Sequence, residues 1–282
     1  MAYAFKIAPG KKVRLADYDA DASGGLSKEE GKARFAKLNA ELDVLQEELY
    51  AAGTHSVLMV LQGMDTSGKD GTIRSVMLNL NPQGCRVESF KVPTEEDLAH
   101  DFLWRIHKVA PRKGTFGVFN RSHYEDVLVV RVHELAPKEV WQARYEQINQ
   151  FEGLLASAGT IVLKFYLHIT KDEQEQRLRE REQDVAKAWK LSAGDWRERE
   201  RWDEYIAAYE DALRKCSTKA APWYVIPANR KWYRNLAVSE ALVDALGAYR
   251  PEWRAALDAM SKERLAELAA FRAEQPAPAE QA

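Results

Sequence analysis

Residues 57–72 read Val-Leu-Met-Val-Leu-Gln-Gly-Met-Asp-Thr-Ser-Gly-Lys-Asp-Gly-Thr and join two kinds of pattern. The apolar run Val57–Leu61 predicts a strand that is buried on both faces, as in a parallel sheet. The loop that follows has the spacing Gly63-x4-Gly68-Lys69, and a helix is expected to begin near Lys69. A strand, a glycine-bearing loop and a helix in this order match a P-loop, which binds phosphate groups.

The residue types of this loop explain how it would hold phosphate. Gly63 and Gly68 let the backbone curl, so that successive N–H groups and the positive end of the helix face one anion. Lys69 adds a mobile positive charge for the outer phosphates. We expect further phosphate contacts from the helix at Gly71, Thr72 and Arg74. The alternative is a strand–helix turn of similar composition that binds nothing.

One position departs from the usual P-loop pattern. Ser or Thr normally follows the lysine and ligates Mg²⁺ with its hydroxyl. Here Asp70 follows, and Thr72 comes two residues later. Asp65 inside the loop is also unusual, because a carboxylate among phosphates repels them unless a cation lies between. We therefore expect Asp65 to be a Mg²⁺ ligand.

The whole chain has the composition of an ordinary globular protein. Its 282 residues can form one large domain or two small ones, with 46% hydrophobic and 30% charged residues. A net charge of −2 does not indicate bulk attraction to nucleic acid or to an anionic membrane. Two widely spaced cysteines suit a reducing, cytoplasmic compartment. The sequence predicts neither a signal peptide nor a membrane-spanning helix.

The segment from Asp19 to Glu30 fits a calcium-binding EF-hand loop position by position. However, Pro9 and Gly10 leave no room for a full entering helix, and no second loop exists to pair with it. A capping box explains the pattern better, with Ser27 as the N-cap of a helix and Glu30 three residues later. The polar residues before it are expected to lie extended on the surface.

Four further strand patterns alternate with helical patterns along the rest of the chain. Together with Val57–Leu61 they predict a five-stranded parallel sheet covered on both faces. The other expected strands are Val87–Phe90, Phe116–Phe119, Thr160–Leu167 and Trp223–Ile226. The expected helices are Glu95–Lys108, Tyr124–His133, Lys138–Ala156, Asp172–Arg181, Trp196–Leu213, Asn235–Tyr249 and Glu252–Ala270.

A second group of polar residues, Asn-Arg-Ser-His-Tyr-Glu-Asp at 120–126, follows the strand at Phe116–Phe119. It therefore lies at the edge where open α/β sheets bind ligands. Arg121 can grip phosphate with its planar fork, and Asp126 is expected to be a second metal ligand. Arg131 lies further along the same helical pattern. The alternative is that Arg121 and Asp126 only pair with each other.

The region from Asp172 to Tyr205 is densely charged. Pairs four residues apart, such as Glu173–Arg177 and Glu175–Arg179, explain most of it as a solvated helix surface. Residues 184–194 interrupt the helical pattern and contain Lys190, which indicates a hinge. A charged helical hairpin before the last strand is where nucleotide kinases carry a lid that excludes water. Arg177 and Arg181 share one helix face and are candidates for contact with phosphate.

The segment Pro227–Arg234, Pro-Ala-Asn-Arg-Lys-Trp-Tyr-Arg, follows the last strand and mixes cations with aromatic rings. It can grip phosphate or stack a base, or it can be an ordinary helix start packed by Trp232. We favour the structural interpretation.

Taken together, these motifs resemble the polyphosphate kinase 2 family. The matching pieces are Gly-Met-Asp-Thr-Ser-Gly-Lys-Asp-Gly, Asn-Arg-Ser-His-Tyr-Glu-Asp-Val-Leu, Arg-Leu-Arg-Glu-Arg with Trp-Lys-Leu-Ser, and Pro-Trp-Tyr-Val-Ile-Pro-Ala-Asn-Arg-Lys-Trp-Tyr-Arg. They come in the family's order across residues 10–248. Asp70 after the P-loop lysine is normal in this family.

The resemblance implies a thymidylate-kinase-like, three-layer α/β/α sandwich with a helical lid. It implies one P-loop kinase domain over residues 1–272, with an N-terminal extension and helix at 1–54, a lid region at 170–216 and a disordered tail at 273–282. It also implies Mg²⁺-dependent transfer of a terminal phosphoryl group between inorganic polyphosphate and AMP or ADP, forming ADP and ATP. Mn²⁺ can replace Mg²⁺, and members are dimers or tetramers.

The residues that match the family's functional positions are Asp65, Lys69, Arg121, Asp126 and Arg181. Polyphosphate is a flexible chain of anions, so a run of cations suits it better than a shaped pocket. Lys69, Arg74, Arg121, Arg177, Arg181 and Lys190 are the candidates to line such a channel. Two rival functions remain at this point: a nucleotide or nucleoside kinase that uses ATP as donor, and a calcium-binding module built on Asp19–Glu30.

Overall fold

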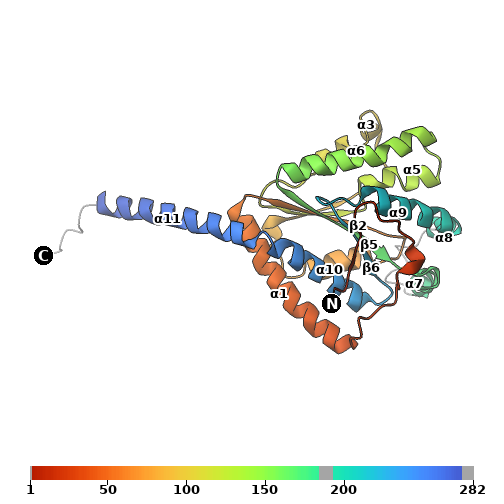
Figure 1. The fold of residues 1–282 in the computed structure, drawn as a ribbon, viewed down its shortest axis with the longest axis horizontal. Coiled ribbons are helices and arrows are strands. Elements are labelled where there is room, and N and C mark those ends of the chain that lie inside the picture. Colours follow the sequence, from red (N-terminus) through yellow and green to blue (C-terminus); the bar gives the residue numbers. More distant parts are fainter. Residues whose placement is uncertain (1, 184–192, 275–282) are drawn as a thin grey trace.

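A six-stranded sheet runs through the middle of the structure, with helices packed on both of its faces (Figure 1). The structure is a computed structural model, and it describes residues 2–183 and 193–274. The strand order is β1-β6-β5-β2-β4-β3, and the pairs among β2–β6 are all parallel. The expected three-layer α/β architecture is confirmed. The strands are β1 (Phe5–Lys6), β2 (Ser56–Gln62), β3 (Cys85–Ser89), β4 (Phe116–Asn120), β5 (Thr160–His168) and β6 (Trp223–Pro227).

The helices divide between the two faces of the sheet. On one face α1, α2 and α10 pack together, while α5, α6 and α9 cover the other face. The helices are α1 (Lys28–Ala52), α2 (Lys69–Val76), α3 (Glu95–Leu98), α4 (Trp104–His107), α5 (Val129–Val132), α6 (Lys138–Ser157), α7 (Lys171–Gln183), α8 (Ala193–Glu200), α9 (Trp202–Cys216), α10 (Lys231–Gly247) and α11 (Arg250–Glu274). Three short 3-10 helices are η1 (Leu15–Asp17), η2 (Pro82–Gly84) and η3 (His123–Asp126).

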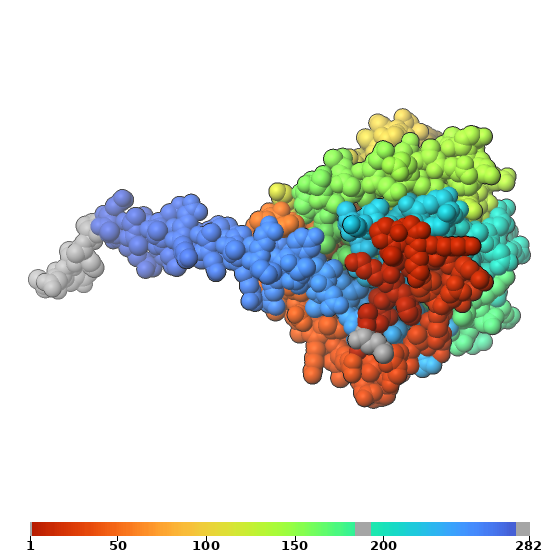
Figure 2. All heavy atoms as spheres, in the orientation of Figure 1, coloured from red at the N-terminus to blue at the C-terminus, as the bar shows by residue number. Residues whose placement is uncertain are grey.

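The prediction of five strands was wrong by one, because the N-terminus adds a short strand. β1 pairs antiparallel with β6, so that Phe5 lies opposite Val225. The segment after it is also less exposed than expected, since Val13, Leu15 and Ala20 are buried. Figure 2 shows this N-terminal segment, in red, lying across the body of the molecule. β1 contains only two residues, and such a short segment has no hydrophobic periodicity from which a strand could be predicted.

Three helices expected as continuous are broken in the structure. The Glu95–Lys108 pattern splits into α3 and α4, because the Asp101 carboxylate accepts a hydrogen bond from the backbone of Leu103 and forms a turn. The Tyr124–His133 pattern splits into η3 and α5 at Leu128, whose backbone is not helical. The Trp196–Leu213 pattern splits at Arg201 for the same reason.

The capping box at the start of α1 is confirmed. The Ser27 hydroxyl accepts from the backbone N–H of Glu30, and the Glu30 carboxylate accepts from the backbone N–H of Ser27 at 2.9 Å. Asp21 instead forms a bidentate ion pair with Arg230, with a shortest distance of 2.6 Å. Asp21 and Glu30 of this segment are thus engaged separately. This arrangement argues against the calcium-binding module.

The last helix, α11, extends from the body of the molecule into solvent (Figures 1 and 2). Its base is fixed by Trp253, which is fully buried and donates to His55. Residues 261–274 are exposed. Because α11 continues to Glu274, the first two residues of the expected disordered tail are helical, and the remaining ones lie outside the described residues. Among the described helices, none is long and apolar enough to cross a membrane.

Candidate active site

The P-loop joins the carboxyl end of β2 to the start of α2, as the sequence predicts. Gly63 and Gly68 have φ angles of 152° and 102°, which are strained for any residue with a side chain. A Cβ at Gly63 would also lie 2.8 Å from the carbonyl oxygen of Leu167. These two glycines therefore shape the loop in the way that phosphate binding requires.

Lys69 points back into the loop. Its ammonium donates to the carbonyl oxygens of Gly63 at 2.8 Å and Met64 at 3.3 Å. Burial, followed by repulsion from Arg121, lowers the pKa of Lys69 to about 8. Among residues 2–183 and 193–274, no carboxylate forms an ion pair with Lys69, and a buried cation of this kind favours a bound anion.

Arg121 lies directly beside the P-loop because β4 is the parallel neighbour of β2, with Asn120 opposite Leu61. Its guanidinium donates to the Asp65 carboxylate at 2.7 Å and lies 3.8 Å from Glu125. Burial opposes the charge of Arg121, but Glu125 and Asp65 more than offset it and raise the pKa. The alternative in which Arg121 only pairs with Asp126 is wrong.

The backbone around Arg121 is held in an uncommon conformation. Arg121 has a φ of 62°, in the left-handed region that residues with side chains rarely adopt. The next residue, Ser122, accepts a hydrogen bond from Gln62 at the end of β2. This contact ties the Arg121 loop to the strand that leads into the P-loop.

A cavity of about 280 Å³ opens between the P-loop, Arg121 and the charged helices. Asp65 and Arg121 form one wall, and the rings of Tyr205 and Tyr209 on α9 form another. Asp195 on α8 also lines the cavity. The guanidinium of Arg181 on α7 lies 3.7 Å from the Asp195 carboxylate. The structure therefore brings Gly63, Asp65, Arg121 and, through Asp195, Arg181 to one place.

A polar cluster connects the charged helices to the body at this cavity. The carboxylate of Glu198 on α8 accepts from Tyr205 at 2.6 Å and lies 2.9 Å from the ring of His133 at the end of α5. Neither His133 nor Glu198 was predicted from the sequence, since each stands alone in a solvated-looking helix pattern. Helices α8 and α9 thus contact the end of α5 through side chains that line the cavity.

Asp126 lies in a different, smaller cavity of about 120 Å³, together with Arg105 and Arg144. Its carboxylate accepts from Arg144 at 3.0 Å. Burial raises the pKa of Asp126 to about 6, against the opposing effect of Arg144 and Arg105. Asp65 and Asp126 therefore line separate cavities. Their joint role as metal ligands stays a prediction. Neither Arg105 nor Arg144 was among the predicted site residues.

Arg177 holds the P-loop by hydrogen bonds to its backbone. Its guanidinium donates to the carbonyl oxygens of Thr66, Ser67, Ala228 and Asn229 and to the Glu173 carboxylate. These bonds occupy all of its donor groups, because a guanidinium has five N–H bonds. We therefore no longer expect Arg177 to contact phosphate in this arrangement.

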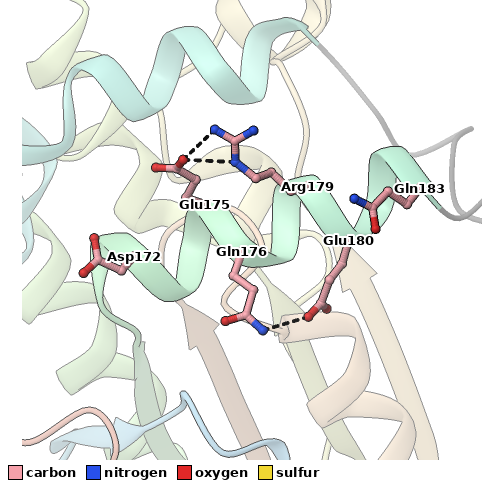
Figure 3. A pocket seen from close by; sticks show the side chains of 6 residues that line it. All are labelled: Asp172, Glu175, Gln176, Arg179, Glu180 and Gln183. Atoms are coloured by element: carbon pink, nitrogen blue, oxygen red, sulfur yellow. Dashed lines mark hydrogen bonds and ion pairs between the residues drawn. The ribbon is translucent and has the colours of Figure 1, made fainter.

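The opposite face of α7 is a solvated surface, as the spacing of its charges predicts. Figure 3 shows Glu175 accepting from Arg179, and Gln176 donating to Glu180, each four residues apart. These residues line a hollow of about 560 Å³. Its side chains are mostly acidic or neutral, so this hollow does not suit a chain of phosphates.

The remaining predicted contacts fall outside the cavities described above. Arg131 pairs with Asp211 at 2.8 Å, and Arg74 is exposed in the last turn of α2. Thr72 is buried, and its hydroxyl donates to the Gly68 carbonyl at 3.1 Å. Gly71 lies in the first turn of α2. Lys190 lies outside the described residues, as do all but the last two residues of the expected hinge at 184–194.

Beneath the Arg121 loop lies a buried charge network that the sequence analysis did not identify. Lys164 on β5 donates to the Glu152 carboxylate, to the Tyr124 hydroxyl at 2.9 Å and to the Cys216 carbonyl at 2.6 Å. Glu152 also accepts from Tyr124 at 2.9 Å and lies 3.1 Å from the His123 ring. Burial opposes ionisation of Glu152, yet Lys164 and His123 hold its pKa below the usual value. A lysine inside the apolar run Thr160–Leu167 was the available signal.

The chain is similar in sequence and in structure to known polyphosphate phosphotransferases. The chain is 54% identical over 244 residues to an "AMP/ADP-polyphosphate phosphotransferase" of Meiothermus ruber, covering 86% of this chain and 91% of that protein. It is 40% identical to an "ADP-polyphosphate phosphotransferase" of Rhodopseudomonas palustris, covering 93% and 95%. The crystal structure of polyphosphate kinase 2 from Arthrobacter aurescens superposes with a TM-score of 0.82 at 44% identity, over 88% of this chain and 92% of that one.

The sequence model "Polyphosphate kinase 2" matches residues 25–253, which include the P-loop, the Arg121 loop and the charged helices. The expected resemblance is thereby confirmed, and the chain belongs to the polyphosphate kinase 2 family.

Proposed function

We propose that this protein transfers the terminal phosphoryl group of inorganic polyphosphate to AMP and ADP, forming ADP and ATP, and that the reaction is reversible. The observation that carries this proposal is that Arg121 and the P-loop residues Gly63 and Asp65 line one cavity, and that the ammonium of Lys69 donates to the carbonyl oxygen of Gly63. The family assignment favours polyphosphate over ATP as donor. The printed activity of the Meiothermus ruber relative supports both acceptors.

In this proposal the chain's own residues position and neutralise phosphate. The P-loop N–H groups and Lys69 hold the end of the polyphosphate chain. Arg121 stands beside them and balances the charge that builds up on the transferred group. An oxygen of the nucleotide's phosphate attacks the terminal phosphorus, a new phosphoanhydride bond forms, and the bond to the rest of the chain breaks. No strong base is needed, because the attacking oxygen is already ionised.

We include Mg²⁺ in the proposal, with Mn²⁺ as a substitute. The described residues hold no cluster of three or more ligating side chains. This donor set still fits Mg²⁺, since the ion commonly uses one or two carboxylates and completes its shell with substrate phosphates and water. Asp65 is the residue best placed to hold it, because its carboxylate lies in the P-loop and lines the cavity. When bound, Mg²⁺ would neutralise phosphate charge.

Two features beyond the reaction belong to the same proposal. Arg181, Asp195 and Glu198 would act as part of a lid that excludes water during transfer, so that hydrolysis does not compete.

The protein would act in the cytoplasm as a homo-oligomer, a dimer or a tetramer. The free thiols of Cys85 and Cys216 suit that compartment. Light scattering coupled to size-exclusion chromatography measures the oligomeric state.

The direct test supplies purified protein with Mg²⁺ and one donor at a time. Long-chain polyphosphate with AMP should yield ADP and ATP, and polyphosphate with ADP should yield ATP. Formation of ATP from ADP alone would overturn the assignment of AMP as an acceptor. If phosphoryl transfer to AMP occurs from ATP and never from polyphosphate, the protein is an ordinary nucleotide kinase. Lys69→Ala serves as the inactive control.

A further inference from the structure

Arg234 is a buried cation that has no ionic partner in the part of the chain that the structure describes. It lies in the first turn of α10 and is 3% exposed. Its Nε and Nη2 atoms donate to the side-chain oxygen of the adjacent Asn235, at 3.0 and 2.8 Å. Within residues 2–183 and 193–274, Arg234 forms no ion pair, and its Nη1 atom has no acceptor. A buried charge without a counter-ion is costly, so its presence calls for a reason.

The guanidinium of Arg234 packs against the P-loop glycine Gly68, with its Nη1 atom nearest. A Cβ added to Gly68 would lie 1.9 Å from Nη1, and a Cβ added to Gly71 would lie 3.2 Å from Nη2. Any side chain at Gly68 would therefore displace the arginine. Gly68 also caps α2 without a side-chain hydrogen bond. The vacant Nη1 atom of Arg234 thus lies against Gly68, the residue that immediately precedes the first N–H groups of α2.

The surroundings of Arg234 are positive. It stands at the N-terminus of a helix, where the helix dipole favours an anion and disfavours a cation. Arg177 lies close enough that burial and its charge together lower the pKa of Arg234 to about 10. All of these features are unfavourable in the free protein and become favourable once an anion binds.

Arg177 and Arg230 do not share this property. Arg177 is equally buried, but its donors are occupied by four carbonyl oxygens and Glu173. Arg230 is exposed and already forms its bidentate pair with Asp21. The vacancy at Nη1 of Arg234 is therefore a specific feature of that residue and not of the segment.

We propose that Arg234 binds a phosphate of the polyphosphate donor, at a position further along the chain than the phosphate held by Lys69. Lys69 reaches into the P-loop towards Gly63, whereas Arg234 flanks its other side at Gly68 and Gly71. A linear polyphosphate can span both positions because it carries a charged group at every repeat. The assignment of the donor rests on the proposed function, while the phosphate contact itself does not.

The experiment compares thermal stabilisation by phosphate ligands in wild type, Arg234→Met and the control Arg230→Met, without any turnover. Tripolyphosphate should raise the Tm of wild type and Arg230→Met, because a ligand that binds the folded state stabilises it. Loss of a charge-assisted hydrogen bond should weaken binding to Arg234→Met about 10- to 100-fold. An undiminished shift in Arg234→Met would overturn the proposal. If Arg234→Met does not fold, Arg234→Lys takes its place and should show a smaller loss.

Two further measurements test whether the phosphate belongs to the donor or to the nucleotide, and they test the role of Arg234 separately from the proposed function. With ADP as the ligand, the Tm shift of Arg234→Met should equal that of wild type. Loss of the response to ADP while the response to tripolyphosphate persists would overturn the assignment to the donor. In turnover, the KM for polyphosphate should rise at least about tenfold while the KM for AMP stays constant. If wild type shows no polyphosphate-dependent turnover, the proposed function fails, and the Tm measurement still decides the role of Arg234.

Discussion

The Arg121 guanidinium donates to the Asp65 carboxylate at 2.7 Å across the opening of the P-loop. Each residue thus neutralises the other in the free protein, and both line the cavity where phosphate would enter. When phosphate and Mg²⁺ bind, Arg121 would turn to the phosphate and Asp65 to the metal. In the proposed mechanism the pair is a resting contact, and phosphate and Mg²⁺ replace it when they bind.

Removing Arg121 should therefore reduce turnover far more than it reduces folding stability. We expect Arg121→Met to lower kcat by about 10³ or more, the range found when an arginine that stabilises phosphoryl transfer is lost. Steady-state kinetics with polyphosphate and ADP measures this effect. Arg272→Met, in the exposed part of α11, is the matched control and should behave as wild type. A kcat within tenfold of wild type for Arg121→Met would rule out its role in the transfer.

The low pKa of Lys69 predicts that polyphosphate binding weakens in alkali. In the free protein Lys69 loses its proton near pH 8, so kcat/KM for polyphosphate should fall about tenfold per pH unit above that value. Lys69→Arg should remove this inflection, since a guanidinium stays protonated. The stability effect has the opposite sign. Between about pH 8 and the ordinary pKa of 10.5 only the unfolded chain holds this proton, so the contribution of Lys69 to unfolding free energy rises with pH.

Asp126 gives a prediction that separates two roles. If its carboxylate acts on the metal or substrate, Asp126→Asn should lose at least 100-fold in kcat while Arg144→Met loses much less.

The raised pKa of Asp126 means that the folded protein holds the proton of this carboxyl group more tightly than the unfolded chain does. The resulting stability is present at low pH and is lost as pH rises through about 6. Asp126→Asn should therefore melt no lower than wild type at pH 7.5. Equal losses of activity in the two variants would show that Asp126 only orients Arg144.

The Lys164–Glu152 pair predicts strong non-additivity. Lys164→Met leaves the Glu152 charge buried beside His123 and should cost about 3–5 kcal/mol in unfolding free energy. The double variant Lys164→Met with Glu152→Gln removes both charges and should recover most of that loss. Urea unfolding of the single and double variants tests this. Additive effects would mean that the two side chains are not energetically coupled.

Much of this structure could be predicted from local patterns. The strand, loop and helix of the P-loop were predicted from the apolar run Val57–Leu61, the glycine spacing and Lys69. This worked because Gly63 and Gly68 adopt positive φ angles that residues with side chains rarely adopt. The capping box of Ser27 and Glu30 likewise involves residues only three positions apart. Such features depend on short-range chemistry, which the sequence records directly.

The parts that could not be predicted depend on distant residues meeting in space. Arg177 has the spacing of a surface ion pair with Glu173, yet the fold places its guanidinium against carbonyl oxygens more than 50 residues away in either direction. Asp126 appeared to share a site with Asp65, but one turn of η3 directs it into another cavity. β1 consists of two residues, and only the exposed edge of β6 makes it a strand.

The measurement that tests the central claim most directly follows ATP formation by the purified protein with Mg²⁺ and long-chain polyphosphate, in separate reactions with AMP and with ADP. The account predicts that ATP accumulates in both, and that Lys69→Ala forms none in either. If neither nucleotide is phosphorylated by polyphosphate while ATP phosphorylates AMP, the assignment of polyphosphate as donor is contradicted.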